Sequence, residues 1–302
     1  NPQIHNNMTD KYREAIAASN VTTDDAAVTK AVNDILEKHL EENRNIDVYK
    51  QIFNSIDLTT LKSTDSEQSV SDFTERVNAF EHEHPDLPNV AAICVYPNRV
   101  AAVRTALEVS SVDIASVAGC FPTAQSFIEV KVAEVGLAVA SGADEIDVVF
   151  GLGDYFDGDY ETVCDDLAEM KHSCRESRMK VILETGALKT AEHIRNASVL
   201  SLYSGADFLK TSTGKEYPGA TLEAAYVMCS CIKEYYEKHG LMVGFKASGG
   251  VSTTEEALKY YTIVKEVLGE KWVADNEYFR IGASRLANNL LGDILGEPVK
   301  FF

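Results

Sequence analysis

The feature that most constrains the fold is a regular alternation of short apolar runs with longer amphipathic stretches, from about residue 51 onward. The eight apolar runs are Ile52–Leu58, Val90–Tyr96, Asp113–Ala118, Glu145–Phe150, Lys180–Glu184, Asp207–Lys210, Leu241–Lys246 and Phe279–Gly282. Stretches with helical periodicity, such as Ser126–Ala140 and Leu222–Lys238, lie between most of them. Strands that alternate with helices indicate βαβ units and a parallel sheet. Eight units predict a closed (β/α)8 barrel, with an open doubly wound sheet as the alternative.

Residues 1–50 have a different pattern, because they are polar and helical. Asp24 and Asp25 are suited to open a helix, and apolar residues recur after them at helical spacing. We expect one amphipathic helix that packs on a larger body. The predicted organisation is a helical extension at 1–50 and a catalytic barrel domain at 51–302. The extension would cover the bottom of the barrel or form a subunit contact. A homo-oligomer is therefore possible.

The charge balance limits the classes of partner. The chain has 28 Lys and Arg against 47 Asp and Glu, a formal net charge of −19. Such a field repels nucleic acid and anionic membranes, so we expect neither as a partner. No apolar run approaches the ~20 residues of a transmembrane helix. A phosphorylated substrate would therefore need a local cationic or amide-lined pocket.

The cysteines and the N-terminus bear on the compartment. The six cysteines show neither a C-x-x-C pair nor a zinc-type spacing, so free thiols in a reducing compartment are expected. Residues 1–10 are polar and lack the apolar core of a signal peptide. The sequence thus predicts a cytoplasmic protein without a metal.

Two lysines end neighbouring predicted strands. Lys210 closes the sixth apolar run and Lys246 closes the seventh, so both side chains would point into the barrel mouth from strands ~4.8 Å apart. Two ammonium groups at this separation repel each other, and burial also disfavours the charged form. One of the two lysines should therefore lose its proton near neutral pH. A neutral lysine can form an imine with a carbonyl substrate. Solvated strand-end lysines are the alternative interpretation.

Carboxylates accompany the lysines. Asp147, on the fourth predicted strand, would face the barrel interior, where it could hold a catalytic water or pair with Lys246. A structural ion pair is the alternative. Asp57 is a weaker candidate, because it could instead cap a turn or helix. Glu184 could lie in the same layer, but the sequence gives it no role.

Three glycine-rich segments follow the late strands: Ser212–Lys215, Ser248–Val251 and Gly282–Arg285. In barrels a phosphate often lies on the loops after strands seven and eight, at a helix N-terminus. Glycines let backbone N–H groups approach the anion, and Lys215 and Ser284 add side-chain donors, with Arg285 as a further candidate. Ordinary helix capping is the alternative.

Three motifs together resemble the deoxyribose-phosphate aldolase family: Asp207–Lys215, Gly244–Gly250 and Asp144–Asp147. The resemblance covers about residues 51–290 and is nearest to the longer members. It implies a TIM barrel and a lyase that reversibly cleaves 2-deoxy-D-ribose 5-phosphate to acetaldehyde and D-glyceraldehyde 3-phosphate. The reaction would proceed through a lysine Schiff base without a cofactor.

The resemblance also implies roles for single residues. Lys210 matches the Schiff-base lysine, Lys246 the lysine that perturbs it, and Asp147 the aspartate that relays protons through water. The implied substrate-binding positions are Asp57, Cys94, Gly214, Lys215, Gly249, Gly250, Gly282 and Ser284. Many members end in a tyrosine, whereas this chain ends in Phe302, so a catalytic tail is in doubt. Another lysine-dependent, transaldolase-like barrel aldolase and a non-catalytic scaffold are the alternatives.

Overall fold

The computed structural model describes residues 11–302, so the polar segment at 1–10 lies outside the described residues. Eight parallel strands form a closed barrel in sequence order. They are β1 (Ile56–Thr59), β2 (Ala92–Val95), β3 (Asp113–Ala118), β4 (Glu145–Val149), β5 (Arg178–Ile182), β6 (Phe208–Lys210), β7 (Gly244–Ser248) and β8 (Phe279–Ala283). Pairing of β1 with β8, with Ile56 opposite Ile281, closes the sheet and excludes the open alternative. The (β/α)8 prediction is confirmed.

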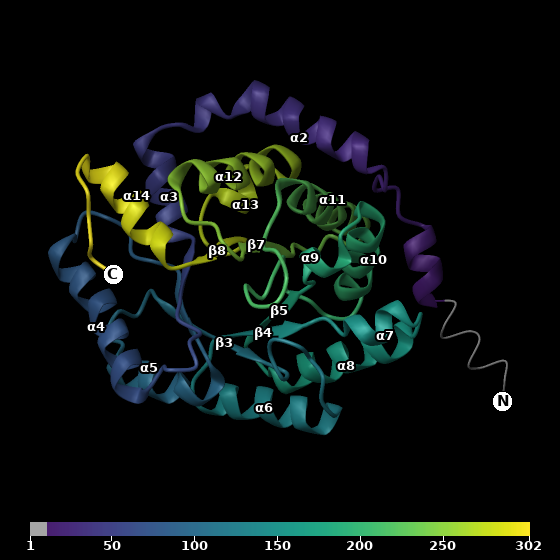
Figure 1. The fold of residues 1–302 in the computed structure, drawn as a ribbon, viewed down its shortest axis with the longest axis horizontal. Coiled ribbons are helices and arrows are strands. Elements are labelled where there is room, and N and C mark those ends of the chain that lie inside the picture. The colour runs from purple at the N-terminus through teal and green to yellow at the C-terminus, as the bar shows by residue number, and fades with distance from the viewer. Residues whose placement is uncertain (1–10) are drawn as a thin grey trace.

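Helices surround the barrel (Figure 1). They are α3 (Ile46–Asn54), α4 (Glu67–Glu83), α5 (Val100–Ala106), α6 (Ile128–Ala140), α7 (Leu152–Phe156), α8 (Tyr160–Ser173), α9 (Thr185–Leu188), α10 (Ala191–Leu202), α11 (Leu222–His239), α12 (Thr254–Leu268), α13 (Glu270–Val273) and α14 (Arg285–Leu295), with 3-10 turns η1 (Glu41–Asn43) and η2 (Pro97–Arg99). Threonines open several of them. Thr221 and Thr253, for example, accept a hydrogen bond from the backbone N–H three residues on. Among residues 11–302, no helix combines the length and the apolar character needed to cross a bilayer.

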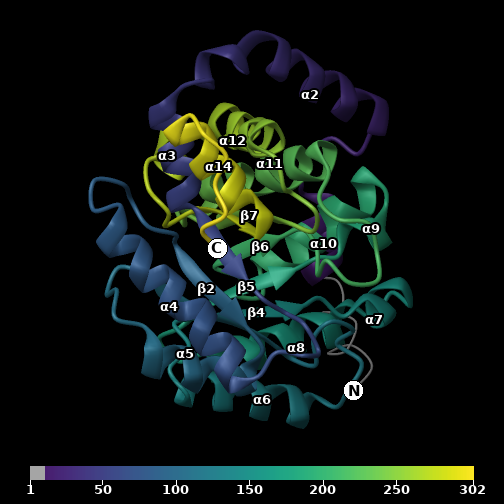
Figure 2. The ribbon, with the colours of Figure 1, turned by 60° about the vertical axis from the view of Figure 1, so that its left-hand side comes forward.

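The N-terminal segment differs from the single helix expected for it. Within the described part it consists of a helical segment at 11–17, α2 (Asp25–His39), η1 and α3. Asp24 caps α2 as predicted, by accepting a hydrogen bond from the Ala27 N–H at 3.1 Å. Val28 and Val32 are buried where α2 packs across α11 and α12, on the outer face of the helix layer (Figure 2). The division at residue 50 stays a prediction.

Several strand predictions began too early, and the first and seventh did so by the most residues. The run expected as a strand from Ile52 is helical through Asn54, because Asn45 caps α3 and Ile52 and Phe53 are on its buried face. β7 starts at Gly244 rather than at Leu241. These two strands also end later than predicted, at Thr59 and Ser248. The expected placement of the two lysines on neighbouring strands is nevertheless correct, because Lys210 lies directly opposite Lys246.

Candidate active site

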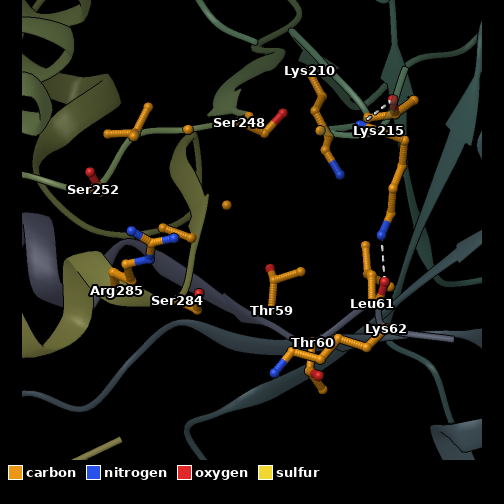
Figure 3. Close-up of a pocket in the computed structure, with 17 residues that line it drawn as sticks. Thr59, Thr60, Leu61, Lys62, Lys210, Lys215, Ser248, Ser252, Ser284 and Arg285 are labelled. Carbon is orange, nitrogen blue, oxygen red and sulfur yellow. Dashed lines mark hydrogen bonds between the residues drawn. The ribbon is translucent and has the colours of Figure 1, made fainter. Parts of the chain in front are cut away.

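A cavity of about 420 Å³ opens at the C-terminal ends of the strands (Figure 3). It is lined by Thr59, Thr60, Leu61, Lys62, Lys210, Thr213, Gly214, Lys215, Ser248, Gly249, Gly250, Val251, Ser252, Gly282, Ala283, Ser284 and Arg285. Four of these residues are cationic and none is acidic. A protein with a net charge of −19 therefore has a positively charged cavity, which is the local feature expected for a phosphate site in an acidic protein.

Of the two predicted lysines, only Lys210 reaches the cavity. Its side chain extends from the end of β6 into the open space (Figure 3). Lys246 is fully buried beneath it and does not line the cavity. A substrate in this space can meet the amine of Lys210 directly, whereas Lys246 can act only through other groups.

Asp147 joins the two lysines. Its Oδ2 accepts hydrogen bonds from Lys210 Nζ at 3.0 Å and from Lys246 Nζ at 2.8 Å, so the predicted pairing with Lys246 is present. Its Oδ1 accepts from Lys180 Nζ at 3.0 Å. Burial alone would raise the pKa of this carboxyl, but the three ammonium groups outweigh burial and hold the pKa well below its usual range. Asp147 is thus a permanent anion next to the reactive amine.

The two lysines differ in pKa. Burial lowers the pKa of Lys210, Asp147 opposes this change, and Lys246 adds to it. Burial acts on Lys246 as well, but the carboxylates of Asp147 and Asp57 outweigh it and raise the pKa of Lys246. The site therefore places a lysine that loses its proton more easily than usual beside a lysine that holds its proton more tightly. Repulsion between the lysines, on which the sequence argument depended, is a smaller cause than burial.

Asp57 and Cys94 lie below the cavity. Asp57 is buried on β1, and its Oδ2 lies 2.6 Å from Lys246 Nζ, so it is an ion-pair partner rather than a turn cap. Cys94 is buried on β2, where burial raises the pKa of its thiol. Neither residue lines the cavity. Glu184 accepts a hydrogen bond from Thr213 Oγ1 at 2.6 Å, which fixes the β6 loop.

The predicted phosphate-end residues do come together. Gly214, Lys215, Gly249, Gly250, Gly282 and Ser284 all line the one cavity. Lys215 Nζ donates a hydrogen bond to the Leu61 carbonyl, which joins the β6 loop to the loop after β1 (Figure 3). Ser284 precedes α14 without capping it through its side chain. A helix N-terminus and several glycine N–H groups in one positive cavity are suited to bind an oxyanion.

Three glycines, Gly219, Gly249 and Gly282, are required by close packing. Gly249 has φ +86°, and a side chain on Gly219, which lies against it, would meet the Gly249 carbonyl oxygen at 1.7 Å. A Cβ at Gly282 would approach Lys246 Cε to 2.9 Å. Gly219 and Gly249 let two loops meet at the cavity wall. Gly282 leaves the space that the Lys246 side chain occupies.

The buried charges beneath the lysines were not predicted from the sequence. Lys180 and Arg280 are 0% and 1% exposed, and both contact Glu145. A signal was available, because Lys180 and Arg280 stand inside strand runs, where a charged side chain needs a partner. The loop after β1, including Lys62, was also missed as part of the cavity wall.

The C-terminal tail lies outside the cavity. Phe302 packs on Phe53 and Phe80, with ring centroids 6.1 and 5.7 Å away. Asn288 binds the tail through its side chain, which accepts from the backbone N–H of Phe301 and of Phe302 at 2.9 Å. The tail therefore fills the seam between α3, α4 and α14, and neither phenylalanine lines the cavity.

The chain is similar to known aldolases in sequence and in fold. The family model described as DeoC/LacD family aldolase matches residues 52–268. A Caenorhabditis elegans protein is 42% identical over 257 residues, 84% of each chain. Human deoxyribose-phosphate aldolase is 36% identical over 245 residues, 78% of this chain and 77% of the human one. The tetrameric deoxyribose phosphate aldolase structure from Aeropyrum pernix has the same fold, with a TM-score of 0.65 at 24% identity over 86% of this chain and 97% of that one. The chain belongs to the DeoC/LacD family of aldolases.

Proposed function

We propose that this protein is a deoxyribose-phosphate aldolase that cleaves 2-deoxy-D-ribose 5-phosphate reversibly to acetaldehyde and D-glyceraldehyde 3-phosphate. The observation that carries the proposal is the position of Lys210. Its amine has a lowered pKa and forms the floor of a cavity whose other charged groups are all cationic. A nucleophilic amine beneath an anion-binding wall suits a substrate with a carbonyl at one end and a phosphate at the other.

In the synthetic direction, the neutral Lys210 amine adds to the acetaldehyde carbonyl, and loss of water gives a protonated imine. The imine nitrogen accepts electrons, so a proton leaves the methyl carbon and an enamine forms. The enamine carbon bonds to the aldehyde carbon of glyceraldehyde 3-phosphate, whose oxygen takes up a proton. Water then hydrolyses the new imine, which releases the sugar and restores the amine. Cleavage follows the same steps in reverse.

Asp147 and Lys246 serve these proton movements in our scheme. The Asp147 carboxylate lies 3.0 Å from Lys210 Nζ and stays ionised, so it stabilises the positive charge of the imine. Lys246, 2.8 Å from the same oxygen, keeps this carboxylate ionised and is the proton donor nearest to it. A water held by Asp147 would carry the proton to and from the methyl carbon.

The phosphate end is assigned to the glycine-rich loops. Gly214, Gly249, Gly250 and Gly282 would offer backbone N–H groups, and the Lys215 and Ser284 side chains would complete the set. Asp57 and Cys94 act indirectly, because both lie below the cavity wall. This division places the carbonyl at Lys210 and the phosphate toward α14.

Turnover of a set of substrates tests the proposal. We expect release of acetaldehyde from 2-deoxyribose 5-phosphate at a kcat/KM at least ~100-fold above that for ribose 5-phosphate or a fructose phosphate. Preference for a ketose phosphate would instead identify a transaldolase-like enzyme. No turnover of any sugar phosphate would identify a binding scaffold. Because the imine supplies the electron sink, we also expect a chelator to leave turnover unchanged.

We further propose a homo-oligomer in the cytoplasm. The outer face of α6 supports self-association, because Phe127 just before it and Val130 and Leu137 on it are 77%, 47% and 68% exposed. Light scattering of the wild type and of Leu137→Lys tests this contact. The six free cysteines suit a reducing compartment.

A further inference from the structure

A layer of seven charged side chains fills the barrel beneath the cavity. Its members are Asp57, Glu145, Asp147, Lys180, Lys210, Lys246 and Arg280, and none is more than 4% exposed. They come from six different strands and contact one another through a chain of ion pairs. Buried charges are tolerated only when each is paired, so the balance of the whole layer determines which member can be neutral.

Lys180 lies at the junction of this layer. Its Nζ donates to Glu145 Oε1 at 2.6 Å and to Asp147 Oδ1 at 3.0 Å, and lies 3.4 Å from Asp57 Oδ2. It thereby contacts all three carboxylates of the layer. It also fixes one oxygen of Asp147, which leaves the other oxygen to Lys210 and Lys246.

The charges of the layer balance without Lys210. Asp57, Glu145 and Asp147 supply three negative charges, and Lys180, Lys246 and Arg280 supply three positive charges. A protonated Lys210 would be a fourth cation with no anion of its own, because Asp147 is already shared by two other lysines. The neutral amine that the chemistry needs is therefore the state that the layer favours.

Other titratable groups border the layer without changing this balance. Arg178 contacts Glu145 but is partly exposed and also pairs with Glu277. Burial, with Glu145 nearby, raises the pKa of Asp113 to about 7, so its charge is reduced at neutral pH. Burial also raises the pKa of the Cys94 thiol, which stays neutral. Glu184 faces Thr213 at the mouth.

We propose that Lys180 is a positioning residue for the aldolase reaction: its charge completes the balance that keeps Lys210 neutral, and its hydrogen bond orients Asp147. The inference rests on the proposed function, since it concerns the Lys210 amine as nucleophile. Removal of the Lys180 charge leaves three carboxylates against two cations, so a proton on Lys210 restores the balance. Removal of the Glu145 charge has the opposite effect.

Three variants test the balance: Lys180→Met, Glu145→Gln and the double variant. The measurement is the pH dependence of the rate at which acetaldehyde and a borohydride reductant modify Lys210, located by peptide mass mapping. In Lys180→Met we expect the midpoint of the acid limb to rise by about one to two pH units, which lowers the rate at pH 7 by about ten-fold or more. In Glu145→Gln the midpoint should fall, and in the double variant it should return close to the wild-type value.

Arg178→Met is the matched control, because it also removes a cation in contact with Glu145, but one that water screens. We expect its midpoint to move by less than about 0.3 pH units. A lower rate in Lys180→Met with an unmoved midpoint, or a double variant that keeps the Lys180→Met midpoint, would overturn the inference while leaving the proposed function intact. Absence of any modification at wild-type Lys210 would instead overturn the proposed function itself.

Discussion

The charged layer and the cavity above it are built in contrasting ways. The layer is made of side chains on strands, is closed to water, and holds every charge in direct contact with an opposite charge. The cavity is lined by strand ends and by the loops that follow them, and it is open. Its wall is rich in glycines, hydroxyl groups and cations and has no carboxylate among its lining residues. The layer therefore sets protonation states, and the cavity supplies recognition. Lys210 is the one residue that belongs to both.

The difference predicts how each region responds to substitution. Removing one partner of a buried ion pair leaves an uncompensated charge, which typically costs about 3–5 kcal/mol of stability. Removing one donor from an open anion site costs only the charge-assisted hydrogen bond, about 1.5–3 kcal/mol of binding free energy. Substitutions in the layer should thus change both stability and chemistry, whereas substitutions at the mouth should change binding.

The largest effect is expected at the residue that the two regions share. Lys210→Met removes the nucleophile. We expect kcat to fall by about 10⁴-fold or more because, among residues 11–302, the other lysines that line the cavity, Lys62 and Lys215, lie on loops rather than on a strand. The measurement is steady-state cleavage of 2-deoxyribose 5-phosphate, with circular dichroism to verify folding. A folded variant that retains a tenth of the activity would contradict the assignment of Lys210.

Asp147→Asn tests the layer through both activity and stability. We expect kcat to fall by about 10²- to 10⁴-fold, because the amide cannot accept a proton or stabilise the imine. The lowered pKa of Asp147 means that its contribution to stability is complete above the pKa of about 3.9 in the unfolded chain, and is lost as the pH falls further.

Urea unfolding between pH 7 and pH 3 measures this contribution. The wild type should lose stability at acid pH more steeply than Asp147→Asn does. Equal slopes for the two proteins would show that Asp147 is not the anion that the layer requires.

A smaller effect is expected at the mouth. Lys215→Met should raise KM for 2-deoxyribose 5-phosphate by about 10- to 100-fold, because one charge-assisted contact to the phosphate is lost. Trapping of acetaldehyde at Lys210 should continue at the wild-type rate. A variant with a lower kcat and an unchanged KM would show that Lys215 takes part in the chemical step rather than in phosphate binding. Such a result would contradict the division of roles between the layer and the cavity.

The smallest effect on activity is expected at the tail. Phe302→Ala empties part of the seam beside Phe53 and Phe80, so we expect a loss of about 1–3 kcal/mol in the free energy of unfolding. Its kcat should stay within about two-fold of the wild type, since the tail does not line the cavity. A large drop in kcat with unchanged stability would give the tail a catalytic role.

The cavity and the charged layer also differ in how well they could be predicted from the sequence. Period-two alternation fixed the inward direction of Lys210, Lys246 and Asp147, and glycine-rich turns after late strands located the phosphate end. Both signals are local. The barrel prediction succeeded for the same reason, since each βα unit can be recognised by itself.

The charged layer could not be derived in the same way. Lys180 and Arg280 acquire their importance from carboxylates 33 to 223 positions away in sequence. Their inward direction was predictable, but the partner of each charge was not, because pairing across the barrel depends on closure and register. For the same reason the sequence suggested repulsion from Lys246 as the main cause of the lowered pKa of Lys210, whereas burial is larger.

In the proposed mechanism Lys210 alone forms the imine. The most direct test is incubation of the protein with acetaldehyde and borohydride at neutral pH, followed by digestion and mass mapping of every lysine. We predict one ethyl group on Lys210 and none on Lys246 or Lys180, which are closed off from the cavity. Modification of Lys246 in place of Lys210, or of no lysine in the barrel, would contradict the role of Lys210 as the nucleophile.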